Sequence, residues 1–183
     1  IQILKYCGEA ALSVYSVISN CVILINSLFT GVGQAIQPII ATNYGAGELK
    51  RINSIRNMSY LTIVIMGVVF SLSGMLFPLQ IGGIFMKIGS ETELLAKSAI
   101  RTYFMAFLPM GINLLTSYYL QSVLSVQRSL CISLLRNILL SSIAIITFPI
   151  LFGGSSLWVV MPVVEAIVLI VSLVFVKSSK VSH

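Results

Sequence analysis

The chain has 183 residues, of which 57% are hydrophobic and only 9% charged, and its mean hydropathy is +1.03. A soluble domain could not cover its surface with so few polar groups, so this composition excludes a soluble globular protein and predicts a membrane protein. The formal net charge is +6, but the Lys and Arg residues occur singly or in pairs near the ends of apolar stretches. The sequence has no basic stripe interleaved with aromatic residues, which argues against nucleic acid as a partner.

Long uncharged stretches predict an all-α fold, a polytopic bundle of transmembrane helices surrounded by membrane lipid. Between Glu9 and Glu48, for example, no Lys, Arg, Asp or Glu occurs. An α-helix rises ~1.5 Å per residue, so a hydrocarbon layer of ~30 Å needs about 20 apolar residues. Five full spans meet this expectation and form a single transmembrane domain over residues 1–183. They cover about residues 10–41, 58–82, 99–124, 130–151 and 156–176.

The distribution of basic residues predicts the orientation, because short cytoplasmic loops carry an excess of Lys and Arg. One side of the membrane would hold Lys50, Arg51, Arg56, Arg128, Arg136, Lys177 and Lys180, and the other Lys5, Lys87, Lys97 and Arg101. The first side is therefore expected to be cytoplasmic, in the inner (plasma) membrane of the cell, with the N-terminus outside. An N-terminus outside implies a preceding helix, so we expect Ile1 to Cys7 to be its tail and the chain to be a fragment.

The first span has one polar face. Its polar residues recur at steps of three and four, which keeps them on one side of a helix. They are Ser13, Ser16, Asn20, Ser27, Thr30, Gln34 and Gln37. Lipid cannot hydrogen-bond such side chains, so the stripe must face a wet cavity or other helices. Cavity lining is the favoured interpretation, because two Gln residues and an Asn exceed what packing usually requires.

The third span repeats this pattern, because Asn113, Ser117 and Gln121 lie at i, i+4 and i+8. We interpret them as a second cavity wall, although a hydrogen-bonded contact between helices would show the same spacing.

Glu165 lies inside the otherwise apolar fifth span. A carboxylate held away from water is costly, so Glu165 is a candidate for binding and releasing a proton or cation, with a purely structural hydrogen-bonded carboxyl as the alternative. Arg136 on the preceding span is an obvious partner. A tight connection near Gly153 would offset the two by about 10 Å along the helices, however, so we expect Arg136 to extend to the cytoplasmic surface. Ser141 and Ser142 are expected to lie closer to the depth of Glu165 in the membrane.

The residue inventory excludes several chemistries. The chain has no Asp, and its single His is His183, so it offers neither an HExxH metal site nor a His base for a nucleophile. Cys7, Cys21 and Cys131 have no metal-ligand spacing, and no GxxxxGK[ST] phosphate loop occurs. We therefore predict no enzyme activity, no catalytic residue, no metal site and no cofactor. Any transport would draw on a gradient of H⁺ or Na⁺.

Three segments resemble the multidrug and toxic compound extrusion (MATE) family. Residues 31–47 (GVGQAIQPIIATNYGAG) are similar to the segment at the cytoplasmic end of that family's eighth helix. Residues 6–12 (YCGEAAL) resemble the pattern just before that helix, and residues 158–165 (WVVMPVVE) resemble the last helix. The three matches keep their order and spacing over nearly the whole chain.

The resemblance implies one lobe of a two-lobe transporter, approximately helices 8–12, whose partner is the missing N-terminal lobe. Such transporters exchange cationic or amphipathic organic compounds, including drugs, for H⁺ or Na⁺. By position, Gln34, Gln37, Pro38, Asn43, Tyr44 and Gly45 belong to the helix-eight motif, and Glu165 to the last helix. Some branches carry an Asp near the place of Asn113. Its absence argues against their cation site in this lobe and leaves coupling to Glu165 or to the other lobe.

Two alternatives remain open. A lipid-linked saccharide flippase of the same superfamily would need a cavity rich in basic residues for pyrophosphate, and Arg101 and Arg136 are few and peripheral for that purpose. A non-catalytic membrane assembly subunit would instead pack its polar stripe fully against partners.

Overall fold

The computed structural model of the protein describes residues 2–86 and 89–178, and in these ranges every regular element is helical. The predicted all-α transmembrane bundle is confirmed. Ile1, Lys87, Lys180 and His183 lie outside the described residues. By length and composition, four helical segments of the described chain can each cross a membrane. These segments are Gly8–Gly45, Leu49–Leu76, Val126–Phe152 and Gly154–Ser178.

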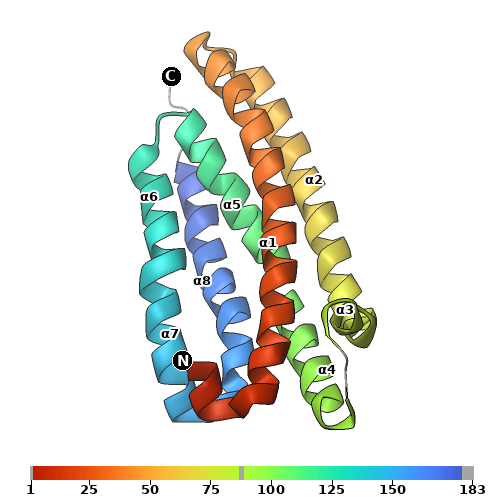
Figure 1. The fold of residues 1–183 in the computed structure, drawn as a ribbon. Coiled ribbons are helices and arrows are strands. Elements are labelled where there is room, and N and C mark those ends of the chain that lie inside the picture. Colours follow the sequence, from red (N-terminus) through yellow and green to blue (C-terminus); the bar gives the residue numbers. More distant parts are fainter. Residues whose placement is uncertain (1, 87–88, 179–183) are drawn as a thin grey trace.

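The first two helices form a long hairpin (Figure 1). Helix α1 covers Gln2–Gly45 and α2 covers Leu49–Leu76. At Gly8 the backbone has φ 78°, a conformation that favours glycine, and the short segment before it runs across the end of the bundle. Gly47, at φ 73°, makes the turn between the two helices. The first predicted span thus lies wholly within α1.

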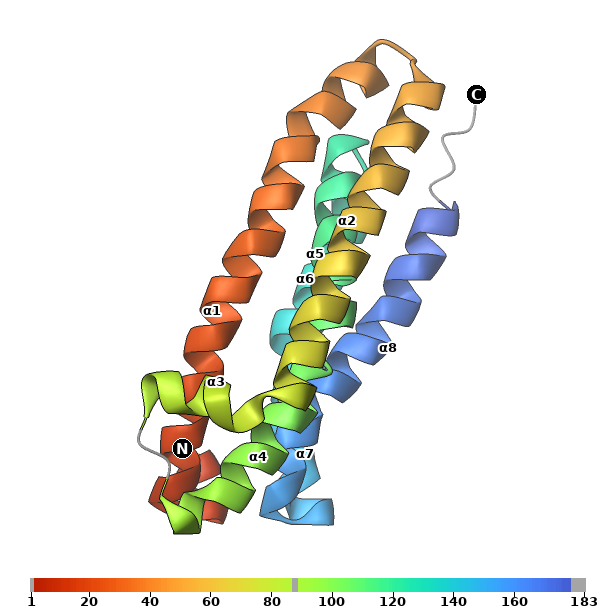
Figure 2. The same ribbon diagram turned by 90° about the vertical axis from the view of Figure 1, so that its right-hand side faces the viewer.

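The third predicted span consists of two helices. Helix α4 covers Ser90–Phe104, α5 covers Phe107–Ser122, and the chain is irregular between them. Pro109 explains the break, because proline lacks a backbone N–H and is accommodated in the first turn of a helix rather than in its interior. A short helix, α3 (Pro78–Phe85), precedes them and runs across the end of α2 (Figure 2).

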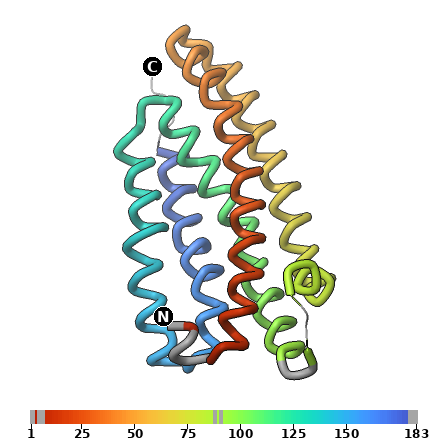
Figure 3. The backbone as a smooth tube through the Cα atoms, viewed as in Figure 1, coloured from red at the N-terminus to blue at the C-terminus, as the bar shows by residue number. Residues whose placement is uncertain are grey.

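The last two spans form a second hairpin. Helix α6 (Val126–Leu134) passes through a π-helical segment, Leu135–Leu139, into α7 (Leu140–Phe152). A 3₁₀ turn, Gly154–Ser156, leads into α8 (Leu157–Ser178). The start of α1 and the end of α8 lie at opposite ends of the bundle (Figure 3), as an odd number of crossings requires.

Helix α5 is the centre of the bundle and packs against α1, α2, α6 and α8. Its residues Phe107, Met110 and Leu115 are fully or almost fully buried, together with Phe29 of α1. Glycines allow the close approach, since a Cβ at Gly111 would lie within 3.1 Å of both Phe29 and the α2 side chain Ile63.

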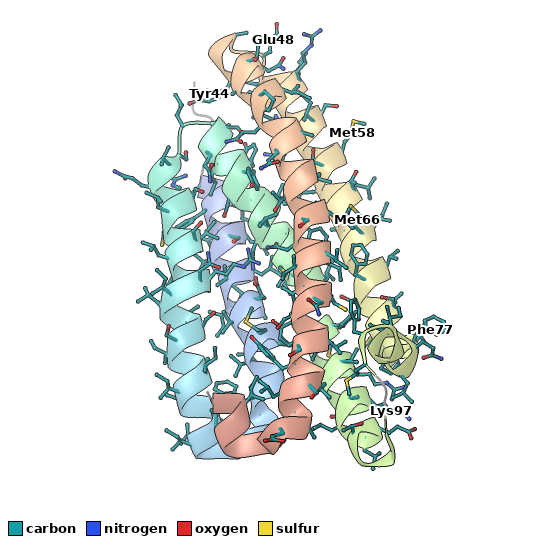
Figure 4. The ribbon with its side chains drawn as sticks, in the orientation of Figure 1. Tyr44, Glu48, Met58, Met66, Phe77 and Lys97 are labelled. Carbon is teal, nitrogen blue, oxygen red and sulfur yellow. The ribbon has the colours of Figure 1, made fainter. Side chains whose placement is uncertain are left out.

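The outer surface of the bundle is apolar, which suits contact with lipid. On α2, Met58 is 68% exposed and points away from the other helices (Figure 4). Large apolar side chains on α6, α7 and α8 are exposed in the same way. Polar and charged side chains that are buried in this apolar bundle are therefore the candidates for a functional site.

Candidate functional site

Arg136 and Glu165 form an ion pair inside the bundle. Arg136 Nε lies 2.5 Å from Glu165 Oε1, and the two side chains are 12% and 0% exposed. The prediction that Arg136 would extend to the cytoplasmic surface is therefore wrong, and Arg136 no longer belongs with the surface residues of that side. Ser141 and Ser142 do not replace it as partners of Glu165. The Ser141 hydroxyl donates to the Arg136 carbonyl, and Ser142 is exposed.

The π-helical segment gives a physical reason for this difference. The sequence-based register assumed a regular α-helix through position 136, but Leu135–Leu139 is π-helical. A π turn contains an extra residue and rotates the preceding part of the helix relative to the following part. This rotation, together with the length of the Arg side chain, allows the guanidinium to reach Glu165 on the neighbouring helix.

Asn113 completes the network from α5. Its Nδ2 donates to Glu165 Oε2 at 2.8 Å and to the Glu165 backbone carbonyl at 2.9 Å. Asn113 is fully buried, and its Oδ1 has no partner among the described residues. Glu165 thus receives one charged and one neutral donor on its two carboxylate oxygens. Tyr103 of α4, a buried titratable group, lies near both members of the ion pair.

The three predicted residues of the third span are only partly brought together. Ser117 and Gln121 line a cavity of about 160 Å³, whereas Asn113 is not among its lining residues and is bonded to Glu165 instead. The cavity lies between α5 and the π-containing helix. Its lining residues are Leu114, Ser117, Tyr118, Gln121, Ser133, Arg136 and Asn137.

The polar stripe of the first span faces away from the described bundle. Five of its members are exposed and two, Thr30 and Gln37, are half-buried. The exposed members are Ser13, Ser16, Asn20, Ser27 and Gln34. The opposite face of α1, which includes Val14, Ile18 and Phe29, is buried in the core. The stripe is therefore free to meet water or another part of the protein.

Gln37 connects the stripe to the interior. Its Nε2 donates to Gln121 Oε1 at 3.4 Å, and Gln121 Nε2 donates to Ser129 Oγ at 2.9 Å. The stripe on α1 and the polar residues on α5 thus approach each other at the end of the bundle where α5 ends.

The helix-eight motif residues lie at the C-terminal end of α1. Pro38 remains inside the helix, and its carbonyl accepts a bond from Thr42 Oγ1 at 2.9 Å. The Asn43 side chain donates to the Ile39 carbonyl, and the Asn43 carbonyl accepts from Glu48 N. Gly45 ends α1, and Tyr44 beside it is half-buried. These residues shape the turn and lie apart from the buried network.

Sequence reasoning missed several residues of the site. Ser133 and Asn137 line the small cavity, and Ser129 bonds to Gln121. Their spacing of four residues, with Arg136 beside them, is the same helical signal that identified the other polar faces. A larger cavity of about 450 Å³ was also missed. It is lined mainly by apolar and aromatic side chains, among them Tyr15, Tyr103 and Trp158.

Solved structures with the same fold are transporters. A MOP superfamily transporter from Pyrococcus furiosus, described as having a binding pocket of reverse polarity, superposes with a TM-score of 0.86 at 15% identity. An outward-facing multidrug resistance MATE family transporter gives 0.85 at 16% identity, and a MATE protein in complex with MaL6 gives 0.84 at 16%. Each match covers 97% of this chain and 40% of the other.

The chain therefore spans about 40% of the length of these transporters. No curated protein matches the chain in sequence. Residues 1–148, by contrast, match the sequence profile of the MatE family. The chain belongs to the MatE family, whose members are membrane transporters.

Proposed function

We propose that the full-length protein is a secondary antiporter. It exports amphipathic or cationic organic compounds in exchange for H⁺ or Na⁺, and the chain described here is one of its two lobes. The observation that carries this proposal is the fully buried Glu165 between Arg136 and Asn113. A buried carboxyl in a membrane-spanning helix lowers the stability of the protein unless it is paired, and such groups commonly have a function in transport.

Glu165 can couple ion binding to helix packing because its partners come from different helices. When Glu165 is ionised, Arg136 holds the π segment against α8, and Asn113 holds α5 against the same point. A proton on Glu165 removes the ion pair and leaves the Arg136 charge without compensation. Because buried groups with missing partners are costly, the two states favour different packing of the second hairpin. An exchanger needs such a pair of states.

The larger cavity fits an amphipathic substrate. Its volume of about 450 Å³ and its aromatic lining are typical of sites for small organic molecules. Trp158 Nε1 has no partner among the described residues, so a bound molecule with an acceptor atom could satisfy it. Aromatic faces such as those of Tyr15 and Tyr103 also attract organic cations.

The exposed polar stripe of α1 supports a water-lined surface toward the other lobe. Asn20 and Gln34 lie on a face of α1 that the described bundle does not cover. Elsewhere on the outer surface of the bundle, exposed side chains such as Met58 of α2 are apolar. A central cavity between two lobes would give the polar face water and would leave the apolar faces to lipid.

The two alternative functions find less support. A flippase for a pyrophosphate-linked lipid would need several basic groups, but the cavities of about 450 and 160 Å³ have one basic lining residue between them, Arg136. A membrane assembly subunit would require partners packed along the whole α1 stripe, and labelling of that stripe distinguishes this function from transport.

The test is proton-driven efflux by the full-length protein in proteoliposomes over a range of external pH. Glu165→Gln keeps the size and the Asn113 contact of the side chain, and it is expected to flatten the pH profile of efflux. Glu93→Gln, at an exposed position on α4, is the matched control and keeps the wild-type profile. An unchanged profile in Glu165→Gln would rule out Glu165 as the coupling site.

A further inference from the structure

The small cavity beside the ion pair has no role in the exchange proposed above. Its volume of about 160 Å³ is below the range of sites for drug-sized molecules. Because a water molecule takes up about 30 Å³ in the liquid, the cavity holds only an ion or a few waters. Any specific ligand must therefore be small.

Five side chains that line this cavity, those of Ser117, Tyr118, Ser133, Arg136 and Asn137, carry hydrogen-bonding groups without partners among the described residues. Ser117, Ser133 and Asn137 make no hydrogen bond there, and Arg136 uses only its Nε. Serines in membrane helices commonly bond to their own helix, as Ser122 does with the Tyr118 carbonyl at 2.8 Å. Ser117 and Ser133 lack that bond, so their hydroxyls remain available to a ligand.

The charge of the lining selects the sign of the ligand. Arg136 is the only charged residue in the lining, and no acidic residue is present. A guanidinium that offers one N–H to a carboxylate retains further N–H donors on its other nitrogens. These donors, two hydroxyls and an amide can surround an anion, whereas the Arg136 charge repels a cation.

We propose that this cavity is a binding site for a small monovalent anion of the size of chloride. Arg136 supplies the charge, and Ser117, Ser133 and Asn137 supply neutral donors from two facing helices. The π-helical segment is part of the site, since it carries both Arg136 and Asn137. Because of the π turn, the Arg136 side chain both contacts Glu165 and lines the cavity.

The anion and Glu165 share one guanidinium, so the charge of Glu165 sets the anion affinity. Tyr103 of α4 lies near both charges of the pair, and Asn113 of α5 donates to Glu165. Neither Asn113 nor a neutral Tyr103 carries a formal charge that could replace the carboxylate charge of Glu165. Loss of the carboxylate charge therefore leaves Arg136 to the anion. By linkage, anion binding raises the affinity of Glu165 for a proton, and protonation of Glu165 raises the affinity of the cavity for the anion. This part of the proposal rests on the proposed function of Glu165.

Bromide is a suitable probe, because it can be located in crystals of the full-length protein by its anomalous scattering. We expect an anomalous peak in the cavity and a rise in thermal stability in bromide relative to gluconate. Asn137→Leu keeps the number of side-chain heavy atoms, leaves the ion pair untouched and replaces the amide donor with apolar carbon, so it should weaken bromide binding about tenfold. Ser142→Val, at an exposed position on the neighbouring turn, is the matched control.

Glu165→Gln gives the opposite expectation, because bromide affinity should rise on the order of tenfold or more. The proposal fails if no bromide peak lies in the cavity, or if Asn137→Leu and Ser142→Val bind bromide equally. Those results leave the pH profile of efflux as an independent test of Glu165. Bromide binding in the cavity together with an unchanged efflux profile in Glu165→Gln would support the anion site and overturn the coupling role.

Discussion

The side-chain hydroxyl of Ser141 donates a hydrogen bond to the backbone carbonyl of Arg136, five residues earlier, at 2.5 Å. A π turn displaces a carbonyl from its regular i→i+4 partner, and a serine five residues later can satisfy it. The bond lies in the turn that directs Arg136 to Glu165. Ser141 is therefore a positioning residue for the ion pair, and it does not contact the carboxylate.

Ser141→Ala should lower the stability of the full-length protein by about 1 kcal/mol, because the Arg136 carbonyl loses a hydrogen-bond donor. It should also shift the pH profile of efflux, because the turn positions Arg136 less firmly against Glu165. Ser142→Ala, one residue further on and exposed, should change neither quantity. Thermal unfolding in detergent and efflux in proteoliposomes measure the two effects. Equal behaviour of the two variants would contradict the role of Ser141.

Removal of one member of the buried ion pair should be strongly destabilising. Arg136→Gln leaves Glu165 buried without a charged partner, and we expect a loss of about 3–5 kcal/mol. The double variant Arg136→Met with Glu165→Leu should recover most of this loss, because apolar side chains replace both charges.

Chemical unfolding of the single and double variants measures this recovery. The double variant should still lack the pH dependence of efflux, which separates stability from coupling. A double variant as unstable as Arg136→Gln would show that the site depends on its polar groups for packing as well.

The helical periodicity of the sequence predicted a single polar face for α1. Polar residues at steps of three and four, such as Asn20 and Gln34, lie on its exposed face, and Phe29 lies on its buried face. The lengths of uncharged stretches predicted five spans, and four helical segments of the described chain are long and apolar enough to cross a membrane, the third predicted span not being among them. The break before α5 was not predicted, although Pro109 is a signal for a helix start when it is read as a first-turn residue.

The ion pair could not be predicted from periodicity, because its geometry depends on a π turn. Single-sequence patterns do not distinguish a π turn at Leu135–Leu139 from regular helix, and one inserted residue changes the direction of Arg136. Asn113 was assigned to a cavity wall for a similar reason. Its spacing with Ser117 fixes a common face of α5, but not which residues of that face meet Glu165.

Gly33 of α1 lies against the ring of Tyr118 of α5, and a Cβ at this position would overlap that ring. Gly33→Ala should therefore destabilise the protein by about 1–3 kcal/mol, the usual cost of overpacking. Gly31, two residues earlier, has nothing within 4 Å of its Cβ position. Gly31→Ala is the control and should be neutral or stabilising by up to about 1 kcal/mol, because alanine favours helix. Similar thermal stabilities for the two variants would show that α1 and α5 do not pack this closely.

The exposure of the α1 stripe can be tested by cysteine labelling of the full-length protein in membranes. In a background with Cys7, Cys21 and Cys131 replaced by Ala, cysteines at Asn20 and Gln34 should react with a membrane-impermeant maleimide, because the proposed cavity brings water to this face.

A cysteine at Ile143, which is 58% exposed on α7, should not react if that face meets lipid. All three positions are exposed in the described bundle, so a difference in their reactivity reports contact with water rather than with lipid, since a maleimide needs an ionised thiol. Unreactive cysteines at both Asn20 and Gln34 would mean that other segments pack against the stripe. In that case, the assembly-subunit function would be favoured over transport.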